Sequence, residues 1–344
     1  MSPRLHVGTY ARNGGAGLHP LLHSAAHGWS VGDPCAEVQN ASFGTYSARH
    51  GLHYFVDEQA EGTLGAFREN PDGWQQLARV STLGAEPCYV SLNADESCLA
   101  VANYGSGSIA LFQLDDRTGL PLDPPTIRQH AGSGPVQDRQ DGPHAHCACF
   151  SRDQRWLYHA DLGADQIIAY PTDRAAGSIG EHRIAYRAPA GSGPRHLAFH
   201  PILPFALLVS ELASTLTVLQ IANGTLAAWQ KASTLPHNFA GESLAGHLSL
   251  NSAGDRVYVT NRGHDSIAVF AWDEGGSLEL LQHMPSGGAS PRSFVLLEAE
   301  RQLLVANEEE DNIVAFPVQA DGTLSPHDDE IALPGAVFLI VGQR

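Results

Sequence analysis

The chain has 344 residues, of which 43% are hydrophobic and 17% charged, with 35 glycines and 21 prolines. This composition excludes a coiled coil or helical bundle, and the spread of apolar residues along the whole chain excludes disorder. The formal net charge is −17, and the single lysine, Lys231, and the arginines form no basic cluster, so neither nucleic acid nor an anionic membrane is an expected partner.

Six segments of the sequence repeat one pattern. A short alternating apolar run is followed by a polar turn, a β-rich run such as residues 256–260, a turn of small residues and a third apolar run such as 267–270. A fourth strand is expected in the variable stretch that follows, as at residues 74–77 and 278–281. Four antiparallel strands in roughly 40–50 residues are typical of a β-propeller blade. In chain order the segments are 41–69, 86–114, 142–171, 193–220, 245–272 and 290–318.

A seventh blade is divided between the two ends of the chain. Residues 334–340 have the pattern of an inner strand, whereas residues 5–10 and 17–22 have the pattern of the strands that follow one. The sequence thus predicts an all-β fold, a seven-bladed β-propeller with four antiparallel strands per blade, in one domain over residues 1–344. Because the paired ends close the ring and leave no free edge strand, a monomer is expected.

The cysteines and the N-terminal sequence bear on the compartment. The five cysteines are odd in number and irregularly spaced, which does not indicate a disulfide framework. Residues 1–15 contain no apolar signal segment, and no apolar stretch is long enough for a transmembrane helix. The expected location is therefore the cytoplasm, with reduced thiols.

Polar residues recur where the predicted first strands begin. In a propeller these strands line the central channel, and side chains at one mouth converge from different blades. Recurring histidine and arginine are not explained by a hydrophobic core. Long charged side chains also follow two second strands, whereas asparagines at that position, such as Asn103, are typical of turns. The candidate site comprises His144, His146, Arg195, His196, Glu211, His247, Arg262 and Arg292.

These residue types point to acid–base chemistry on a small anionic, oxygen-rich molecule. Histidine and glutamate move protons, and arginine binds carboxylate or phosphate groups and stabilises an oxyanion. His144 and His146 could chelate a metal from one strand, but the neighbouring guanidiniums disfavour a cation. Neither a metal nor a cofactor is therefore expected. The sequence also lacks the GxSxG, Walker A and GxGxxG motifs of serine hydrolases and nucleotide-binding proteins.

The chain resembles the seven-bladed lactonase family, which includes propeller-type bacterial 6-phosphogluconolactonases and fungal 3-carboxy-cis,cis-muconate lactonizing enzymes. The most specific segments are residues 193–201 with 210–212 and residues 146–151, supported by 103–109 and 261–262. The resemblance implies that a histidine, two arginines and a glutamate catalyse the reaction. By their motifs they correspond to His146, Arg195, Glu211 and Arg262, and the additional His144 leaves the choice of acid–base histidine open, with His146 favoured.

Three functions remain open from the sequence. The first is hydrolysis of 6-phosphogluconolactone or a related aldonolactone, in which Glu211 or His146 activates water, Arg195 and Arg262 stabilise the oxyanion, and Arg292 holds an anionic tail. The second is a carboxymuconate-type cycloisomerase or lactone isomerase that uses the same residues, and the third is a non-enzymatic binding scaffold. The acidic run 308–310 disfavours a phosphorylated ligand if it faces the mouth, and is otherwise a solvated turn. The remaining substrate-binding residues are expected to be His144, His196, His247, Asn103 and Tyr104.

Overall fold

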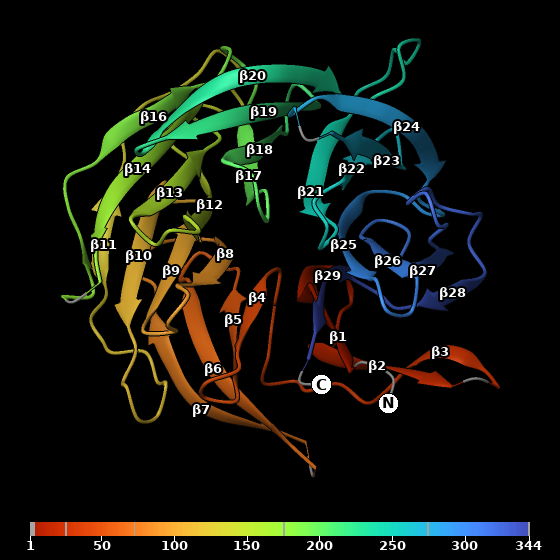
Figure 1. The fold of residues 1–344 in the computed structure, drawn as a ribbon. Coiled ribbons are helices and arrows are strands. Elements are labelled where there is room, and N and C mark those ends of the chain that lie inside the picture. Colours follow the sequence, from red (N-terminus) through yellow and green to blue (C-terminus); the bar gives the residue numbers. More distant parts are fainter. Residues whose placement is uncertain (1–3, 25, 72, 175, 274, 343–344) are drawn as a thin grey trace.

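In the computed structural model, the described residues, 4–342 except 25, 72, 175 and 274, form seven antiparallel sheets arranged around a central channel (Figure 1). The predicted all-β, seven-bladed propeller is confirmed. One short 3-10 helix, Ala11–Asn13, is present in the described part of the chain. Residues 1–3 and 343–344 of the predicted domain lie outside the described residues.

Each blade runs from an inner strand at the channel to an outer strand. Blade 1 consists of β4 (Gly44–Ser47), β5 (Leu52–Asp57), β6 (Thr63–Asn70) and β7 (Gly73–Ser81), and blade 2 of β8 (Pro87–Leu92), β9 (Cys98–Asn103), β10 (Ser108–Gln113) and β11 (Thr126–Gln129). Blade 3 consists of β12 (Ala145–Phe150), β13 (Trp156–Asp161), β14 (Gln166–Asp173), β15 (Ser178–Ile179) and β16 (Arg183–Arg187). Blade 4 consists of β17 (Pro194–Phe199), β18 (Phe205–Ser210), β19 (Thr215–Ala222) and β20 (Thr225–Ser233). Blade 5 consists of β21 (Leu244–Leu250), β22 (Arg256–Arg262), β23 (Ser266–Trp272) and β24 (Leu278–Pro285), and blade 6 of β25 (Pro291–Leu297), β26 (Gln302–Asn307), β27 (Asn312–Pro317) and β28 (Asp329–Ala332). Blade 7 consists of β29 (Ala336–Val341), β1 (Leu5–Thr9), β2 (Leu18–Ser24) and β3 (Gly28–Val31).

The divided seventh blade is also confirmed. The C-terminal strand β29 is its inner strand and pairs with β1 in a register that sets Leu5 opposite Val341 and Thr9 opposite Ala336. Figure 1 shows β1 and β29 side by side in this blade. Because Leu5 and Val341 lie at one end of the strand pair and Thr9 at the other, Leu5 and Val341 lie toward the opposite mouth of the channel from Tyr10.

Blade 3 differs from the predicted four strands, because its sheet has five. The long strand β14 pairs with the outer strand β16 through residues 166–169, and its far end pairs with the two-residue strand β15 through Thr172 and Asp173. The additional strand arises because β14 extends beyond the part that β16 covers.

Apolar residues form a separate core between each pair of neighbouring blades. For example, Leu52 and Tyr54 of blade 1 pack with Val90 and Leu99 of blade 2, and all four are at most 1% exposed. Seven such clusters are found among the described residues, one at every blade interface around the ring. Each blade is therefore held by its two neighbours, as in other repeat architectures.

Two observations concern the compartment. In the part of the chain that the structure describes, no helix has the length and apolar character needed to cross a membrane. The five cysteines, Cys35, Cys88, Cys98, Cys147 and Cys149, are all free and buried. The cytoplasmic location stays a prediction.

Buried histidines at the blade interfaces make the fold sensitive to acid. His53 on β5 is 1% exposed and packs against Phe55 and Trp74, with ring centroids 5.8 and 4.9 Å away. Burial, followed by the proximity of His6, lowers the pKa of His53 to about 4. As pH falls from about 6.5, the unfolded chain binds a proton that folded His53 does not bind, so the free energy of unfolding decreases until about pH 4.

We therefore expect the melting temperature to fall between pH 6.5 and 4, and the fall to be smaller in His53→Phe, whose ring suits the aromatic surroundings. Thermal melts at several pH values would measure this slope. The exposed His27→Gln is the control and should retain the wild-type slope. An unchanged slope in His53→Phe would show that His53 does not cause the acid sensitivity.

Candidate active site

The inner strands of several blades share a β-bulge near one mouth of the channel. In four blades the first strand contains one extra residue relative to the second strand, as at a β-bulge, which turns that side chain out of the regular alternation. The extra residues of these four blades are Cys88, His146, Arg195 and Arg292. Blade 5 has a comparable register shift at Gly246 and His247. The sequence predicted three of these positions but not the bulge that orients them.

A second set of residues lies directly after the second strands. The backbone N–H of each of Tyr104, Glu211 and Glu308 donates to a carbonyl just before the first strand of its own blade, at Glu86, Gly193 and Ser290 respectively. The equivalent residue is Tyr10 in blade 7 and Arg262 at the end of β22 in blade 5. Three residues of this set, Tyr104, Glu211 and Arg262, line one cavity together with three of the bulge residues. These bulge residues are Cys88, His146 and Arg292.

Glu211 is the centre of the site. It is 2% exposed, and its Oε2 accepts hydrogen bonds from Arg195 Nε at 2.8 Å and lies 2.8 Å from Arg262 Nη2. Its Oε1 accepts a hydrogen bond of 2.5 Å from Arg139 Nη2. The Nε2 atom of His146 lies 3.8 Å from Oε2. The four predicted catalytic residues thus converge, together with a third arginine.

The charges in this cluster fix its protonation. Burial alone would raise the pKa of Glu211, but the charges of Arg262, Arg195 and Arg139 lower it well below its usual range. Burial and the neighbouring Arg262 lower the pKa of Arg195 to about 10. At neutral pH the cluster therefore contains an ionised glutamate and charged arginines.

His146 is neutral in this environment. Burial lowers the pKa of His146 well below its usual value, Arg195 lowers it further, and Glu211 opposes the shift only in part. The Nδ1 atom lies 3.7 Å from Cys88 Sγ, and the ring meets Tyr104 edge-on with centroids 5.5 Å apart. A neutral imidazole beside a carboxylate can accept a proton, and the carboxylate stabilises the cation that forms.

Arg292 is paired differently from the other arginines. Its Nη2 donates to Tyr10 Oη at 2.7 Å and lies 3.8 Å from Glu58 Oε2, and its Nη1 lies 3.4 Å from Glu308 Oε2. Burial opposes its charge, but Tyr10, Glu58 and Glu308 raise the pKa of Arg292. Its charge is therefore compensated by protein carboxylates, which the sequence-based assignment to an anionic tail did not foresee.

These groups surround a cavity of about 220 Å³. Its lining residues are Arg12, Glu58, Gln59, Glu86, Cys88, Tyr104, Arg139, His146, Glu211, Arg262 and Arg292. Arg195, His196 and His247 instead line a much smaller void beneath it, which His146 and Arg292 also border. Arg195 thus supports Glu211 from below, and the expectation that it contacts the reacting oxygen is not matched by its position.

Two more of the expected binding residues, Asn103 and His144, line neither the cavity nor this void. The Asn103 side chain donates to Ser108 Oγ at 3.1 Å and to the Thr82 carbonyl at 3.4 Å, so it closes a blade turn. His144 Nδ1 donates to the Tyr104 carbonyl at 3.0 Å, and its ring stacks on that of Tyr104 at 4.5 Å. His144 therefore positions Tyr104, and His146 is the histidine that faces Glu211.

Sequence reasoning missed Arg139, Arg12, Glu58 and Glu86. Arg139 lies in the long connection between β11 and β12, outside the repeat, so no spacing could place it. Glu58 follows β5 where Glu211 follows β18, and a full comparison of the second-strand ends would have found it. Arg12 and Glu86 lie beside the ends of repeat segments and carry no motif.

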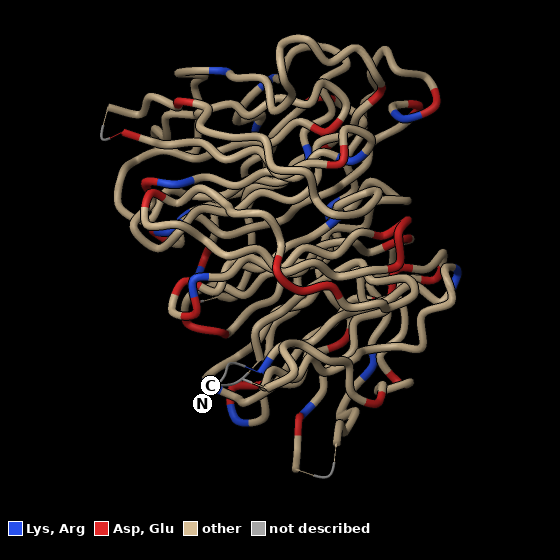
Figure 2. The backbone as a smooth tube through the Cα atoms, turned by 90° about the vertical axis from the view of Figure 1, so that its right-hand side faces the viewer, with Lys and Arg blue, Asp and Glu red and all other residues tan. Residues whose placement is uncertain are grey.

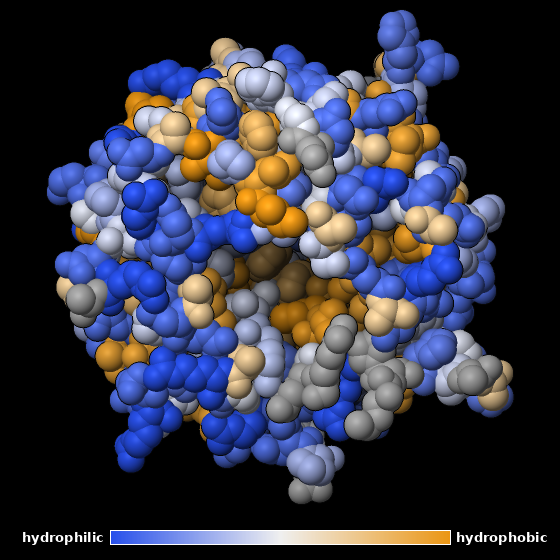
Figure 3. Space-filling model, viewed as in Figure 1, coloured by the Kyte–Doolittle hydropathy of each residue, from blue (hydrophilic) through white to orange (hydrophobic). Residues whose placement is uncertain are grey.

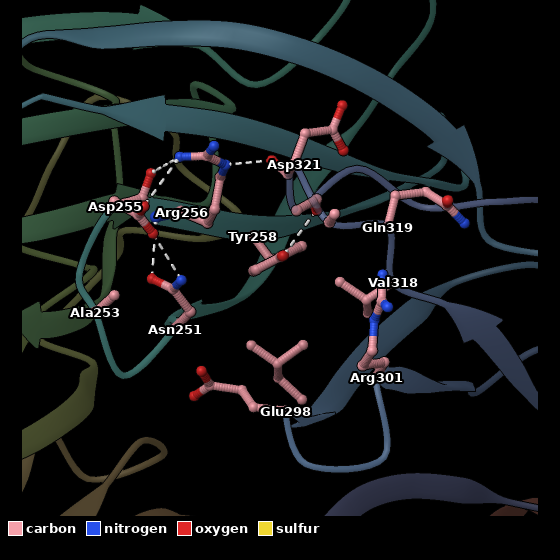
Figure 4. Close-up of a pocket in the computed structure, with 13 residues that line it drawn as sticks. Asn251, Ala253, Asp255, Arg256, Tyr258, Glu298, Arg301, Val318, Gln319 and Asp321 are labelled. Carbon is pink, nitrogen blue, oxygen red and sulfur yellow. Dashed lines mark hydrogen bonds and ion pairs between the residues drawn. The ribbon is translucent and has the colours of Figure 1, made fainter.

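A larger groove of about 280 Å³ lies elsewhere, between blades 5 and 6 (Figure 4). Two of its polar side chains are bonded within the groove: Asn251 Nδ2 donates to Asp255 Oδ1 at 2.7 Å and Tyr258 Oη to the Gly322 carbonyl at 2.8 Å. Its lining contains no histidine or cysteine. Figure 3 shows the ring hollowed at its centre, and the channel cavity, with its acid–base groups, is the candidate active site.

The chain matches the family described as "Lactonase, 7-bladed beta-propeller" over residues 4–341. It belongs to the seven-bladed lactonase family. The family predicted from the sequence is thus confirmed. Among its lactonase relatives, the 6-phosphogluconolactonase of Bacillus subtilis (strain 168) is 30% identical over 319 residues, 90% of each chain. An uncharacterized protein of Lactococcus lactis subsp. lactis, YwcC, is 31% identical over 324 residues, 92% of each chain.

Solved structures resemble this lactonase-family chain over almost its whole length. The periplasmic gluconolactonase PpgL of Pseudomonas aeruginosa has a TM-score of 0.90 and 29% identity, covering 99% of both chains. A putative 6-phosphogluconolactonase of Bacteroides fragilis has a TM-score of 0.87 and 28% identity, covering 98% of this chain and 97% of that one.

Proposed function

We propose that this lactonase-family protein hydrolyses a sugar-acid lactone, 6-phosphogluconolactone or a related aldonolactone, in the channel cavity. The observation that carries the proposal is the pairing of a neutral, buried His146 with an ionised Glu211 held by three arginines at an open cavity. The names of its relatives add support, since they include a 6-phosphogluconolactonase and a gluconolactonase.

His146 is the better general base of the two acid–base groups. Both oxygens of Glu211 already accept from guanidiniums, so this carboxylate is a weak base, whereas neutral His146 has an available lone pair. In the proposed reaction, His146 takes a proton from water as the water oxygen attacks the lactone carbonyl. The ring C–O bond then breaks, and the leaving ring oxygen takes the proton from the imidazolium to give the open hydroxy acid.

Arg139 and Arg262 stabilise the tetrahedral oxyanion in this reaction. Both line the cavity and both contact Glu211, so their guanidinium groups are fixed before substrate binds. Preorganised charges of this kind act on charge that develops in the transition state. Hydrolysis is favoured over cycloisomerisation, because Arg292, the group expected to grip a substrate carboxylate, is occupied by Glu58 and Glu308.

A pH-stat assay of acid release from a panel of aldonolactones, with and without EDTA, tests the proposal. We expect turnover above the spontaneous rate in both conditions, and Arg262→Ala should lower kcat by roughly 10²–10³, the scale for one oxyanion donor. The control is Arg301→Ala, since Arg301 is exposed and lines the other groove. No turnover of any lactone would overturn the proposal, and loss of activity in EDTA that a divalent ion restores would overturn the metal-free mechanism.

A further inference from the structure

The cavity has two sides of opposite character. The arginine side, from blades 2 to 5, has Arg139, Arg262 and the one carboxylate of Glu211 in its wall, with Arg195 beneath Glu211. The acidic side, from blades 6, 7 and 1 and the turn before blade 2, has Glu58, Glu86, Arg12 and Arg292 in its wall. A third carboxylate, Glu308, does not line the cavity but lies directly behind this wall, against both guanidiniums. The arginine side has an excess of positive charge and the acidic side an excess of negative charge.

The guanidiniums of the acidic side are already neutralised by its carboxylates. Arg12 Nη2 lies 3.2 Å from Glu308 Oε1, and Arg292 contacts both Glu308 and Glu58. Glu58 and Glu308 are mostly buried, with side chains 13% and 12% exposed, so solvent screens them little. Glu86 stands at the same wall, exposed and without an ion pair in the described part of the chain. An additional anion placed here would meet uncompensated negative charge.

The two sides also orient a substrate. The cavity of about 220 Å³ lies below the usual ~300–1,000 Å³ of ligand pockets, so a monosaccharide-sized lactone reaches both sides. Its carbonyl belongs at the arginine side, beside His146 and Glu211. The far end of the sugar then lies against Glu58 and Glu86, with the charge of Glu308 behind them, and ionised carboxylates only accept hydrogen bonds. Hydroxyl groups satisfy such acceptors, and a phosphate does not.

From this charge division we infer that the substrate is a neutral polyhydroxy lactone, without a phosphate or carboxylate on the end remote from the carbonyl. The inference rests on the proposed lactone hydrolysis and narrows it to unphosphorylated aldonolactones. Glu58 and Glu308 are the residues that set this specificity. The net charge of −17, spread as acidic residues over the blades in Figure 2, adds long-range repulsion of a phosphorylated ligand.

The test compares D-glucono-1,5-lactone with its 6-phosphate in the pH-stat assay, after subtraction of spontaneous hydrolysis. For the wild type, kcat/KM should be at least about tenfold higher for the unphosphorylated lactone, because like charges brought together at a binding site strongly disfavour binding. Equal values, or a preference for the phosphate, would overturn the inference while leaving the proposed hydrolysis intact. Turnover of neither lactone, nor of any other in the panel, would instead overturn the proposed function.

Two variants test the cause of the preference. Glu308→Gln and Glu58→Gln each remove one negative charge with little change of shape, and each should lower the ratio of kcat/KM between the two lactones by about tenfold. Since the readout is a ratio within one variant, a general loss of activity does not mimic it. Glu309→Gln is the matched control, because Glu309 is the exposed neighbour of Glu308 and, unlike Glu308, forms no ion pair with Arg12 or Arg292. A ratio that neither variant changes would overturn the assignment.

Discussion

Glu211→Gln is expected to lower kcat for lactone hydrolysis by about 10³-fold, the middle of the range for losing an acid–base partner. The amide cannot stabilise an imidazolium at His146, and it cannot hold Arg139, Arg195 and Arg262 in their present geometry. Removing the anion from beside nearly buried guanidiniums should also lower the free energy of unfolding by ~3–5 kcal/mol. Steady-state kinetics and urea unfolding measure the two effects on one protein sample.

The control for this prediction is Glu211→Asp, which retains the charge but shortens the side chain. Its stability should lie closer to wild type than that of Glu211→Gln, while its kcat falls because the contacts to Arg139 and His146 lengthen. If Glu211→Gln kept its activity, the cluster would serve only to stabilise the channel, and the proposed mechanism would be wrong.

His146→Gln is expected to lower kcat by roughly 10²–10⁴, because the variant lacks the general base. In the wild type, the lowered pKa of His146 should keep kcat/KM constant through neutral pH and confine its acidic fall to values well below 6.5. The charged or titratable groups around this ring are Arg195, Glu211, Arg292, His196, Cys88 and Tyr104. A pH–rate profile of wild type and variant measures the effect, and the acidic fall should be absent in His146→Gln.

His144→Gln separates this role from that of its neighbour. His144 contacts Tyr104 and Asp141 rather than the cavity, so its loss should change KM more than kcat. If His144→Gln removed the acidic fall and His146→Gln did not, the two roles would be reversed.

Much of the fold was predictable because every blade packs against its two neighbours in the same way. Alternating apolar strands need partners on both faces, and the repeat at residues 245–272 therefore recurs around the ring. The incomplete runs at 5–10 and 334–340 predicted the divided blade for the same reason. The fifth strand in blade 3 was not predictable, since β15 consists of two residues and depends on how far β14 extends.

Only those site residues that lie within the sequence repeat could be predicted. Glu211 and Arg262 are long charged side chains at the ends of second strands, a position that the repeat defines, and so the sequence could place them. Arg139 reaches Glu211 from an irregular connection, and its contact depends on the three-dimensional path of that loop. The sequence-based expectation that Arg195 contacts the reacting oxygen does not match its position in the structure. The repeat predicts where along its strand such a residue lies, but not whether its side chain points into the cavity or beneath it.

The pairing of β1 with β29 makes the order of synthesis matter. Tyr10, which binds Arg292, immediately follows a strand whose partner β29 is translated after all the other blades, and its own backbone N–H donates to the Gly335 carbonyl at 2.9 Å. Until β29 has left the ribosome, the acidic side of the cavity therefore lacks its support from blade 7. A transcript truncated before the codons for β29 would encode every predicted catalytic residue and still produce a protein whose ring cannot close.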